Sequence, residues 1–192
     1  MNFQNGLNYL QFKNTREKDE DLEMITKKEV MQTDFFNSLP ENLLNKISNI
    51  NKKTYIGVFS SAKCPDAATL TPLLLNLASL NDNICVKFFK KDDTSDFLEK
   101  NLNEVKIPTV LNLSSENKII AKYCEFPCTL KVILKEKEFR EDADSIIDEF
   151  RNGKYNNMLL EELIDLMLGH NHPNYLTFDK TALPYRNPEN QV

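Results

Sequence analysis

Short apolar runs alternate along the chain with longer segments in which apolar residues recur every three or four positions. Residues 55–59 form a run of mainly aromatic and β-branched residues that ends in two serines, which is typical of a buried strand. Residues 65 to about 80 carry apolar residues at helical spacing, and residues 84–89 form a second apolar run. Together they predict a strand, a helix and a parallel strand joined by a right-handed crossover.

The second half of the chain predicts a hairpin and more helices. Residues 110–113 and 119–123 are apolar runs separated by the polar residues 114–117, so we expect two antiparallel strands at the edge of a mixed sheet. Further helices are expected near residues 38–50, 92–102, 127–134, 144–150 and 156–168. We expect the apolar stripe of the last helix to dock on the core, with a partner groove or dimer surface as the alternative.

Two local signals indicate where helices begin and end. Ser38 and Glu41 have the spacing of a capping box, which predicts that a helix starts at Ser38. Gly153 follows the segment 144–150 and predicts a left-handed cap at its end.

Length and composition predict one ordinary core with additions. The 192 residues are 41% hydrophobic and 28% charged, enough for a single domain with extensions. We expect an N-terminal extension with helical parts at 1–37, the core at 38–137, a C-terminal helical extension at 138–169, and an extended or disordered tail at 170–192.

Charge and hydropathy exclude some classes of partner. The net charge is −5 and the pI is near 5.2, which argues against a nucleic-acid partner, because phosphate binding needs a clustered positive surface. No run approaches the roughly 18 apolar residues of a membrane span, and the N-terminus lacks a signal-peptide pattern. We therefore expect no membrane partner and a cytoplasmic location.

The residue with the clearest chemical potential is Cys64, which lies where the strand passes into a helix. Pro65 suits the first helical turn because it has no N–H to leave unpaired. The free amides and positive dipole end of the helix, with Lys63 alongside, are expected to lower the pKa of the thiol, while repulsion from Asp66 acts against them. We expect a net lowering and a thiolate at Cys64. The alternative is a cysteine that only packs at a helix start.

The motif Cys64-Pro65-Asp66-Ala67, with Pro108 in the later sequence Ile-Pro-Thr, resembles the thioredoxin-like superfamily. Within it, the chain is similar to a bacterial group whose motif usually reads Trp-Cys-Gly-Asp-Ala. The resemblance covers about residues 50–137. It implies a thioredoxin-like α/β fold, with a central mixed sheet flanked by helices, and a cis-proline at position 108 beside the sulfur.

Three departures from the superfamily pattern bear on activity. Ala67 stands where the resolving cysteine would be, Lys63 replaces a tryptophan, and Val58 stands where thioredoxins have a buried aspartate. These differences argue against a fast disulfide reductase. What remains is a monothiol that would need an outside thiol to release it from a mixed disulfide.

Cys124 is the candidate for a substitute resolving thiol. The resemblance implies that the strand ending there lies close to the cis-proline, and a disulfide with Cys64 would need Cα atoms within about 7 Å. Pairing of Cys124 with Cys128 is an alternative, and two free thiols are the simpler interpretation. Cys85, inside an apolar run, is expected to be buried and inert.

No cofactor or metal site is predicted. The sequence has no glycine-rich phosphate loop, and His170 and His172 lack a third ligand, so we interpret them as surface residues. Two functions remain open. One is thiol–disulfide exchange, with Cys64 as nucleophile, Pro65 and Asp66 at its helix start and Pro108 shaping the groove, and with a protein disulfide or a low-molecular-weight thiol as partner. The other is a non-catalytic module that binds a protein or peptide in the same groove.

Overall fold

The computed structural model describes residues 1–15, 19–137 and 143–172. In these ranges one four-stranded sheet has the order β2-β1-β3-β4. Its strands are β1 (Thr54–Ser60), β2 (Ile84–Lys90), β3 (Thr109–Leu113) and β4 (Ile119–Cys124). The pair β1 and β2 is parallel, and the other two pairs are antiparallel, which confirms the predicted mixed sheet and hairpin.

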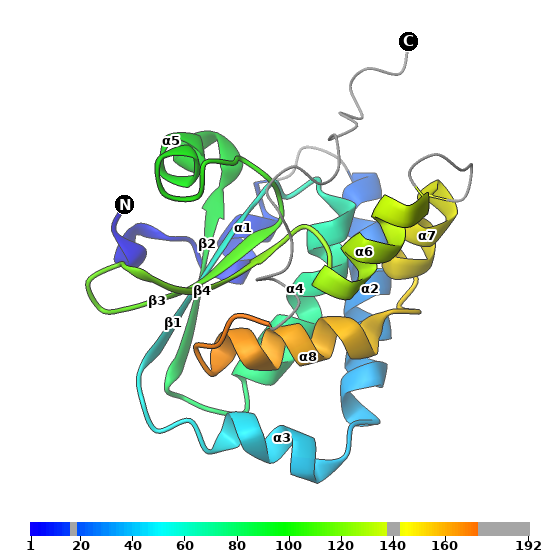
Figure 1. Ribbon diagram of the computed structural model, residues 1–192, viewed down its shortest axis with the longest axis horizontal. Coiled ribbons are helices and arrows are strands. Elements are labelled where there is room, and N and C mark those ends of the chain that lie inside the picture. The colour runs from blue at the N-terminus through cyan, green and yellow to red at the C-terminus, as the bar shows by residue number, and fades with distance from the viewer. Residues whose placement is uncertain (16–18, 138–142, 173–192) are drawn as a thin grey trace.

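Helices flank the sheet on both faces (Figure 1). The helical elements of the described residues are η1 (Phe3–Asn5), α1 (Tyr9–Lys13), α2 (Asp19–Asn37), α3 (Glu41–Ser48), α4 (Pro65–Ala78), α5 (Lys91–Leu102), α6 (Cys128–Lys137), α7 (Ala143–Arg151) and α8 (Asn156–Met167). Each helix predicted from the periodicity is present, and the sequence is therefore an α/β chain with a thioredoxin-like fold.

Alternating residues of β1 build a core on each face of the sheet, as the period of a strand requires. Ile56 and Val58 belong to the larger cluster, together with α4 and α8. Phe59 belongs to the smaller cluster with Leu98 of α5. Figure 1 accordingly shows α5 on the opposite side of the sheet from α4 and α8. The apolar stripe of α8 is buried in the larger cluster, which confirms that it docks on the core.

The N-terminal segment packs against the rest of the fold. Leu7 forms an antiparallel bridge with Phe88, so it covers the free edge of β2. Phe12 is buried in the larger cluster, and the Gln32 amide of α2 donates to the carbonyl oxygen of Thr69 in α4 at 2.9 Å. The predicted domain boundaries stay predictions. The start of the predicted C-terminal extension (138–142) and the tail from residue 173 lie outside the described residues.

One predicted cap is wrong and another is confirmed. The Ser38 hydroxyl donates to the carbonyl oxygen of Phe35, so it closes the end of α2, and α3 begins after Pro40 without a side-chain cap. Gly153 has φ +84° and ends α7 as predicted, in a conformation that favours glycine. Among the described residues, no helix has the length and apolar character that a membrane crossing requires.

Candidate functional site

Cys64 occupies the N-cap position of α4. Strand β1 ends at Ser60, and the short loop that follows is closed by the Cys64 amide, which donates to the Ser61 carbonyl oxygen at 3.1 Å. Pro65 lies in the first helical turn, and the Ala68 amide donates to the Cys64 carbonyl oxygen at 3.0 Å. The predicted strand, turn and helix are therefore present, and Cys64 is half-buried as a residue while its sulfur is largely buried.

The strand register gathers three of the expected residues at one edge of the sheet. Thr109, directly after Pro108, pairs with Phe59 on one side and with Cys124 on the other. The Ile107–Pro108 peptide bond is cis. The end of the sheet at which β1 terminates therefore holds Pro108, the last residue of β4 and the loop that leads to Cys64.

The environment of Cys64 corrects the expected direction of its pKa. Burial of the sulfur, followed by the charge of Asp66, raises the pKa of Cys64 to about 11. The amides of Ala67 and Asp66 and the Ser60 hydroxyl act to lower the pKa, but they do not outweigh these two effects. Desolvation penalises the charged form of a thiol, and a nearby carboxylate penalises it further. Cys64 is therefore a protonated thiol at neutral pH, and the predicted thiolate is wrong.

Asp66 has a partner that the sequence did not indicate. The guanidinium Nε of Arg151, the last residue of α7, donates to Asp66 Oδ1 at 2.8 Å. The side chains of Arg151 and Asp66 are 32% and 15% exposed, so the ion pair is only partly screened by water. The pKa of Arg151 is raised despite its burial, chiefly because of Asp66. A basic residue in the last helical turn was visible in the sequence, but nothing there placed it beside residue 66.

Ala67 and Val58 mark what the site lacks. Position 67 holds an alanine, so the site has no second thiol there. Ala67 is 3% exposed and lies among the buried residues of α4. Val58 is fully buried in the larger cluster and offers no group for proton transfer.

Cys124 lies next to Thr109 and close to Pro108, as the resemblance implied, but it is buried. It is 2% exposed, and its sulfur lies 3.6 Å from the Thr109 hydroxyl oxygen. Burial raises the pKa of Cys124 to about 11. All four cysteines of the chain are free thiols, and Cys85 is partly exposed rather than buried as expected, because it lies on the outer strand β2. These properties do not favour Cys124 as a resolving thiol.

The Cys128 thiol lies at the start of α6, in a buried polar cluster. Cys128 is fully buried, its amide donates to the Glu162 carboxylate, and burial together with Glu162 raises the pKa of the thiol to about 12. The pKa of Glu162 is itself raised by burial. His172 Nδ1 lies 3.9 Å from Glu162 Oε1, so His172 packs against α8 rather than on the open surface. In the ranges that the structure describes, no three His, Cys, Asp or Glu side chains form a metal-binding group.

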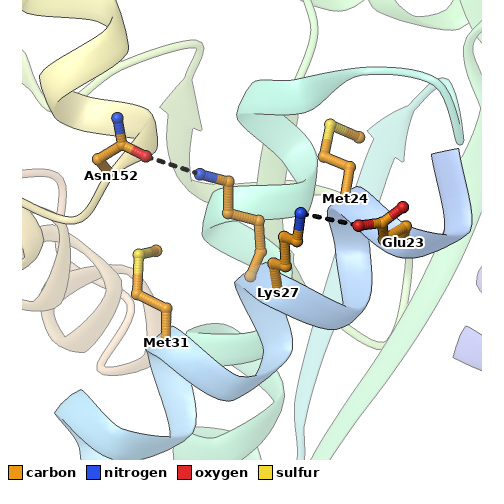
Figure 2. A pocket seen from close by; sticks show the side chains of 6 residues that line it. Glu23, Met24, Lys27, Met31 and Asn152 are labelled. Carbon is orange, nitrogen blue, oxygen red and sulfur yellow. Dashed lines mark hydrogen bonds and ion pairs between the residues drawn. The ribbon is translucent and has the colours of Figure 1, made fainter. Parts of the chain in front are cut away.

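Two surface pockets lie away from Cys64. One, of about 420 Å³, is formed by α2 and the turn after α7. Figure 2 shows Glu23, Met24, Lys27 and Met31 along α2, with Asn152 facing them from that turn. The other, of about 680 Å³, lies between the N-terminal residues and α5. Neither is lined by the cysteine or the cis-proline.

The fold and the helix-start cysteine define an α/β protein of the thioredoxin-like class. A family model described as "Thioredoxin" matches residues 10–146, and the chain therefore belongs to this thioredoxin family. None of the curated proteins compared with the chain matches it.

Solved structures agree on the fold. A protein of unknown function from Pseudomonas aeruginosa is similar over 87% of this chain and 95% of its own, with 20% identity and a TM-score of 0.70. An HIV epitope-scaffold is similar over the same shares, with 18% identity and a TM-score of 0.70. An alkylhydroperoxide reductase from Enterococcus faecalis is similar over 50% of each chain, with 23% identity and a TM-score of 0.40, and adds nothing to this assignment.

Proposed function

We propose that the protein exchanges thiols and disulfides through Cys64, as a monothiol that forms a mixed disulfide. The observation that carries this proposal is the position of Cys64: the residue is half-buried and forms the N-cap of α4, at the end of the sheet that also holds cis-Pro108. The amides of Asp66 and Ala67 act on its sulfur in the direction that favours a thiolate.

The chemistry needs one outside disulfide and one outside thiol. The Cys64 thiol loses its proton to solvent, and its sulfur attacks one sulfur of the disulfide. A new S–S bond forms at Cys64 while the old one breaks, and the second sulfur leaves as a thiolate. Because Ala67 supplies no thiol, a thiol from solution must attack the mixed disulfide to release Cys64. A protein disulfide and a low-molecular-weight thiol are the partners we propose, in a reducing compartment such as the cytoplasm.

The raised pKa makes this exchange slow at neutral pH. With a pKa of about 11, about one Cys64 thiol in ten thousand is ionised at pH 7. A more basic thiolate is a stronger nucleophile, which offsets part of this loss, so the attack should be about twenty times slower than that of an unperturbed thiol. A basic thiol is also a poor leaving group, so we expect a mixed disulfide at Cys64 to persist.

The raised pKa also favours a second candidate, the non-catalytic binding module. In that function the edge beside Pro108 holds a protein or peptide segment, and the Cys64 thiol stays reduced. The two candidates differ in one property, which is whether Cys64 forms a covalent adduct.

The test uses the reduced full chain with Cys85→Ser, which removes the other partly exposed thiol. We would add 5,5′-dithiobis(2-nitrobenzoate) at pH 8 and at pH 9 and follow both the released coloured thiolate and the protein mass. We expect one adduct per chain on Cys64, faster at pH 9, stable until a small thiol is added, and absent when Cys64→Ser is also present. If Cys64 forms no adduct at pH 9, exchange is contradicted and the binding module is supported.

A further inference from the structure

The ion pair between Arg151 and Asp66 lies beside the Cys64 thiol. Asp66 is two residues after Cys64, in the first turn of α4, and its Oδ1 accepts from Arg151 Nε at 2.8 Å. Arg151 comes from α7, 85 positions along the chain, so the pair joins the C-terminal helices to the helix that begins at Cys64.

Two further contacts hold Arg151 in this place, and a third holds its neighbour Asn152. The Lys28 ammonium of α2 donates to the backbone carbonyl oxygen of Arg151 and lies 3.5 Å from Asn152 Oδ1. Figure 2 shows Asn152 facing α2 across the pocket. Arg151 Nη1 is also 3.6 Å from Asp148 Oδ1, on the previous turn of α7. The backbone of Arg151 is thus tied to α2, and its guanidinium also contacts a carboxylate of its own helix.

The local structure of α4 does not by itself require this partner. An acidic side chain in the first turn of a helix is already favoured by the helix dipole, and partly exposed ion pairs contribute little to stability. The charge of Asp66, however, opposes ionisation of Cys64, whereas Cys64 and Arg151 attract each other when both are charged. Asp66 therefore disfavours the Cys64 thiolate, and Arg151 favours it.

We propose that Arg151 is a positioning residue for Cys64: it binds the Asp66 carboxylate and supplies the positive charge that offsets it beside the sulfur. The biological meaning of this role rests on the proposed exchange at Cys64. In this arrangement Arg151 offsets part of the Asp66 charge, and what remains of that charge still opposes the thiolate formed during exchange. The helices outside the predicted core are then part of the reactive site.

The two members of the pair should have opposite effects on reactivity. Replacing Arg151 with Gln leaves the Asp66 carboxylate unopposed and makes the Cys64 thiolate rarer. Replacing Asp66 with Asn removes the repulsion and makes it more common. At a pH below the pKa, the alkylation rate follows the thiolate fraction, so a shift of one unit changes the rate about tenfold. When both are replaced, both charges are gone, and the rate should return toward that of the parent.

The experiment measures iodoacetamide alkylation of Cys64 at pH 8 in the full chain with Cys85→Ser. Relative to that parent, we expect Arg151→Gln to be about three- to tenfold slower, Asp66→Asn faster by a similar factor, and the double variant to lie between them. Arg151→Lys should keep most of the parent rate because it keeps the charge. Lys154→Gln is the matched control, since it removes an exposed cation three residues away that pairs with Glu149.

Several outcomes would overturn the inference. One is an Arg151→Gln rate equal to that of Lys154→Gln, and another is a double variant as slow as Arg151→Gln alone. A folding defect would expose Cys64 and speed alkylation, which is opposite to the expected change for Arg151→Gln, and thermal unfolding of each variant checks this. The disulfide-adduct assay tests the proposed exchange independently of this inference. If no adduct forms but the alkylation rates change as expected, the proposed exchange is wrong and the role of Arg151 stands.

Discussion

In the part of the chain that the structure describes, one helix begins directly after a cysteine and another begins at one, and the comparison between them shows what decides the state of a thiol. Cys64 caps α4, and Cys128 is the first residue of α6. Each has a carboxylate nearby, Asp66 in the first case and Glu162 in the second, and the pKa values of the two thiols are raised to about 11 and about 12. A helix start does not make a thiolate when the sulfur is desolvated and faces a carboxylate.

The difference between the two sites lies in access and in charge compensation. Cys64 is partly exposed, and its carboxylate neighbour binds the guanidinium of Arg151. Cys128 is fully buried, and the Glu162 carboxylate is occupied as an acceptor for the Cys128 amide. The Cys64 residue keeps some contact with solvent, whereas the second arrangement fastens α6 to α8.

The largest expected effect concerns stability at alkaline pH. The pKa values of Cys64 and Cys124 are raised to about 11 and that of Cys128 to about 12, so above pH 9 the unfolded chain loses thiol protons that the folded chain keeps. The unfolded state then binds fewer protons, and the free energy of unfolding falls as pH rises, by about 1 kcal/mol per pH unit for each thiol. Below the unfolded pKa these groups add no pH dependence.

Urea unfolding at pH 8, 9 and 10 measures this slope. Cys128→Ala should unfold with a weaker dependence on pH than the wild-type chain, because one of the three thiols with a raised pKa is gone. Equal slopes for the two proteins would contradict the raised pKa of Cys128.

The two carboxylates should differ in their structural importance. Glu162→Ala leaves the buried Cys128 amide without its acceptor, so we expect a loss of about 2 kcal/mol in the free energy of unfolding. Asp66→Ala removes a partly exposed ion pair and should lose less than about 1 kcal/mol. Glu162→Gln keeps an acceptor and serves as the control. Chemical denaturation measures all three, and a larger loss for Asp66→Ala than for Glu162→Ala would reverse the comparison.

A resolving thiol can be supplied to the exposed site. Residues 64 and 67 are one helical turn apart, a separation that a disulfide can span, so Ala67→Cys should release an adduct on Cys64 from within the chain. We expect the adduct lifetime to fall about tenfold or more relative to the parent.

Ala68→Cys is the matched control, because it introduces the same thiol at the next position, where the helix turns it away from Cys64. Both alanines are nearly buried, so circular dichroism must first show that each variant folds. If the two variants release the adduct at the same rate, the geometry assigned to the start of α4 is wrong.

The sequence predicted the fold better than it predicted the site. The positions of β1, β2, β4 and α4 could be predicted from the spacing of apolar residues and from the turn residues between segments, because these signals act between near neighbours. The capping box predicted at Ser38 was wrong, because the Ser38 hydroxyl donates to a carbonyl oxygen at the end of α2 rather than capping the start of α3. The cis peptide at Pro108 was implied by resemblance, not by the residues themselves.

The electrostatics of the site depended on distant parts of the chain. Arg151 reaches Asp66 across 85 positions, a contact that no local pattern encodes. The pKa of Cys64 was expected to fall because amides and a helix dipole can be inferred locally, whereas the desolvation that raises it comes from the packed surroundings of the sulfur.

The most direct test of the account is the pH dependence of Cys64 alkylation in the chain with Cys85→Ser. Desolvation and Asp66 outweigh the helix start, so the rate should rise about tenfold for each pH unit from 7 to 10 without levelling off. A rate that reaches its plateau below pH 8 would show an ionised thiol at neutral pH and contradict the account.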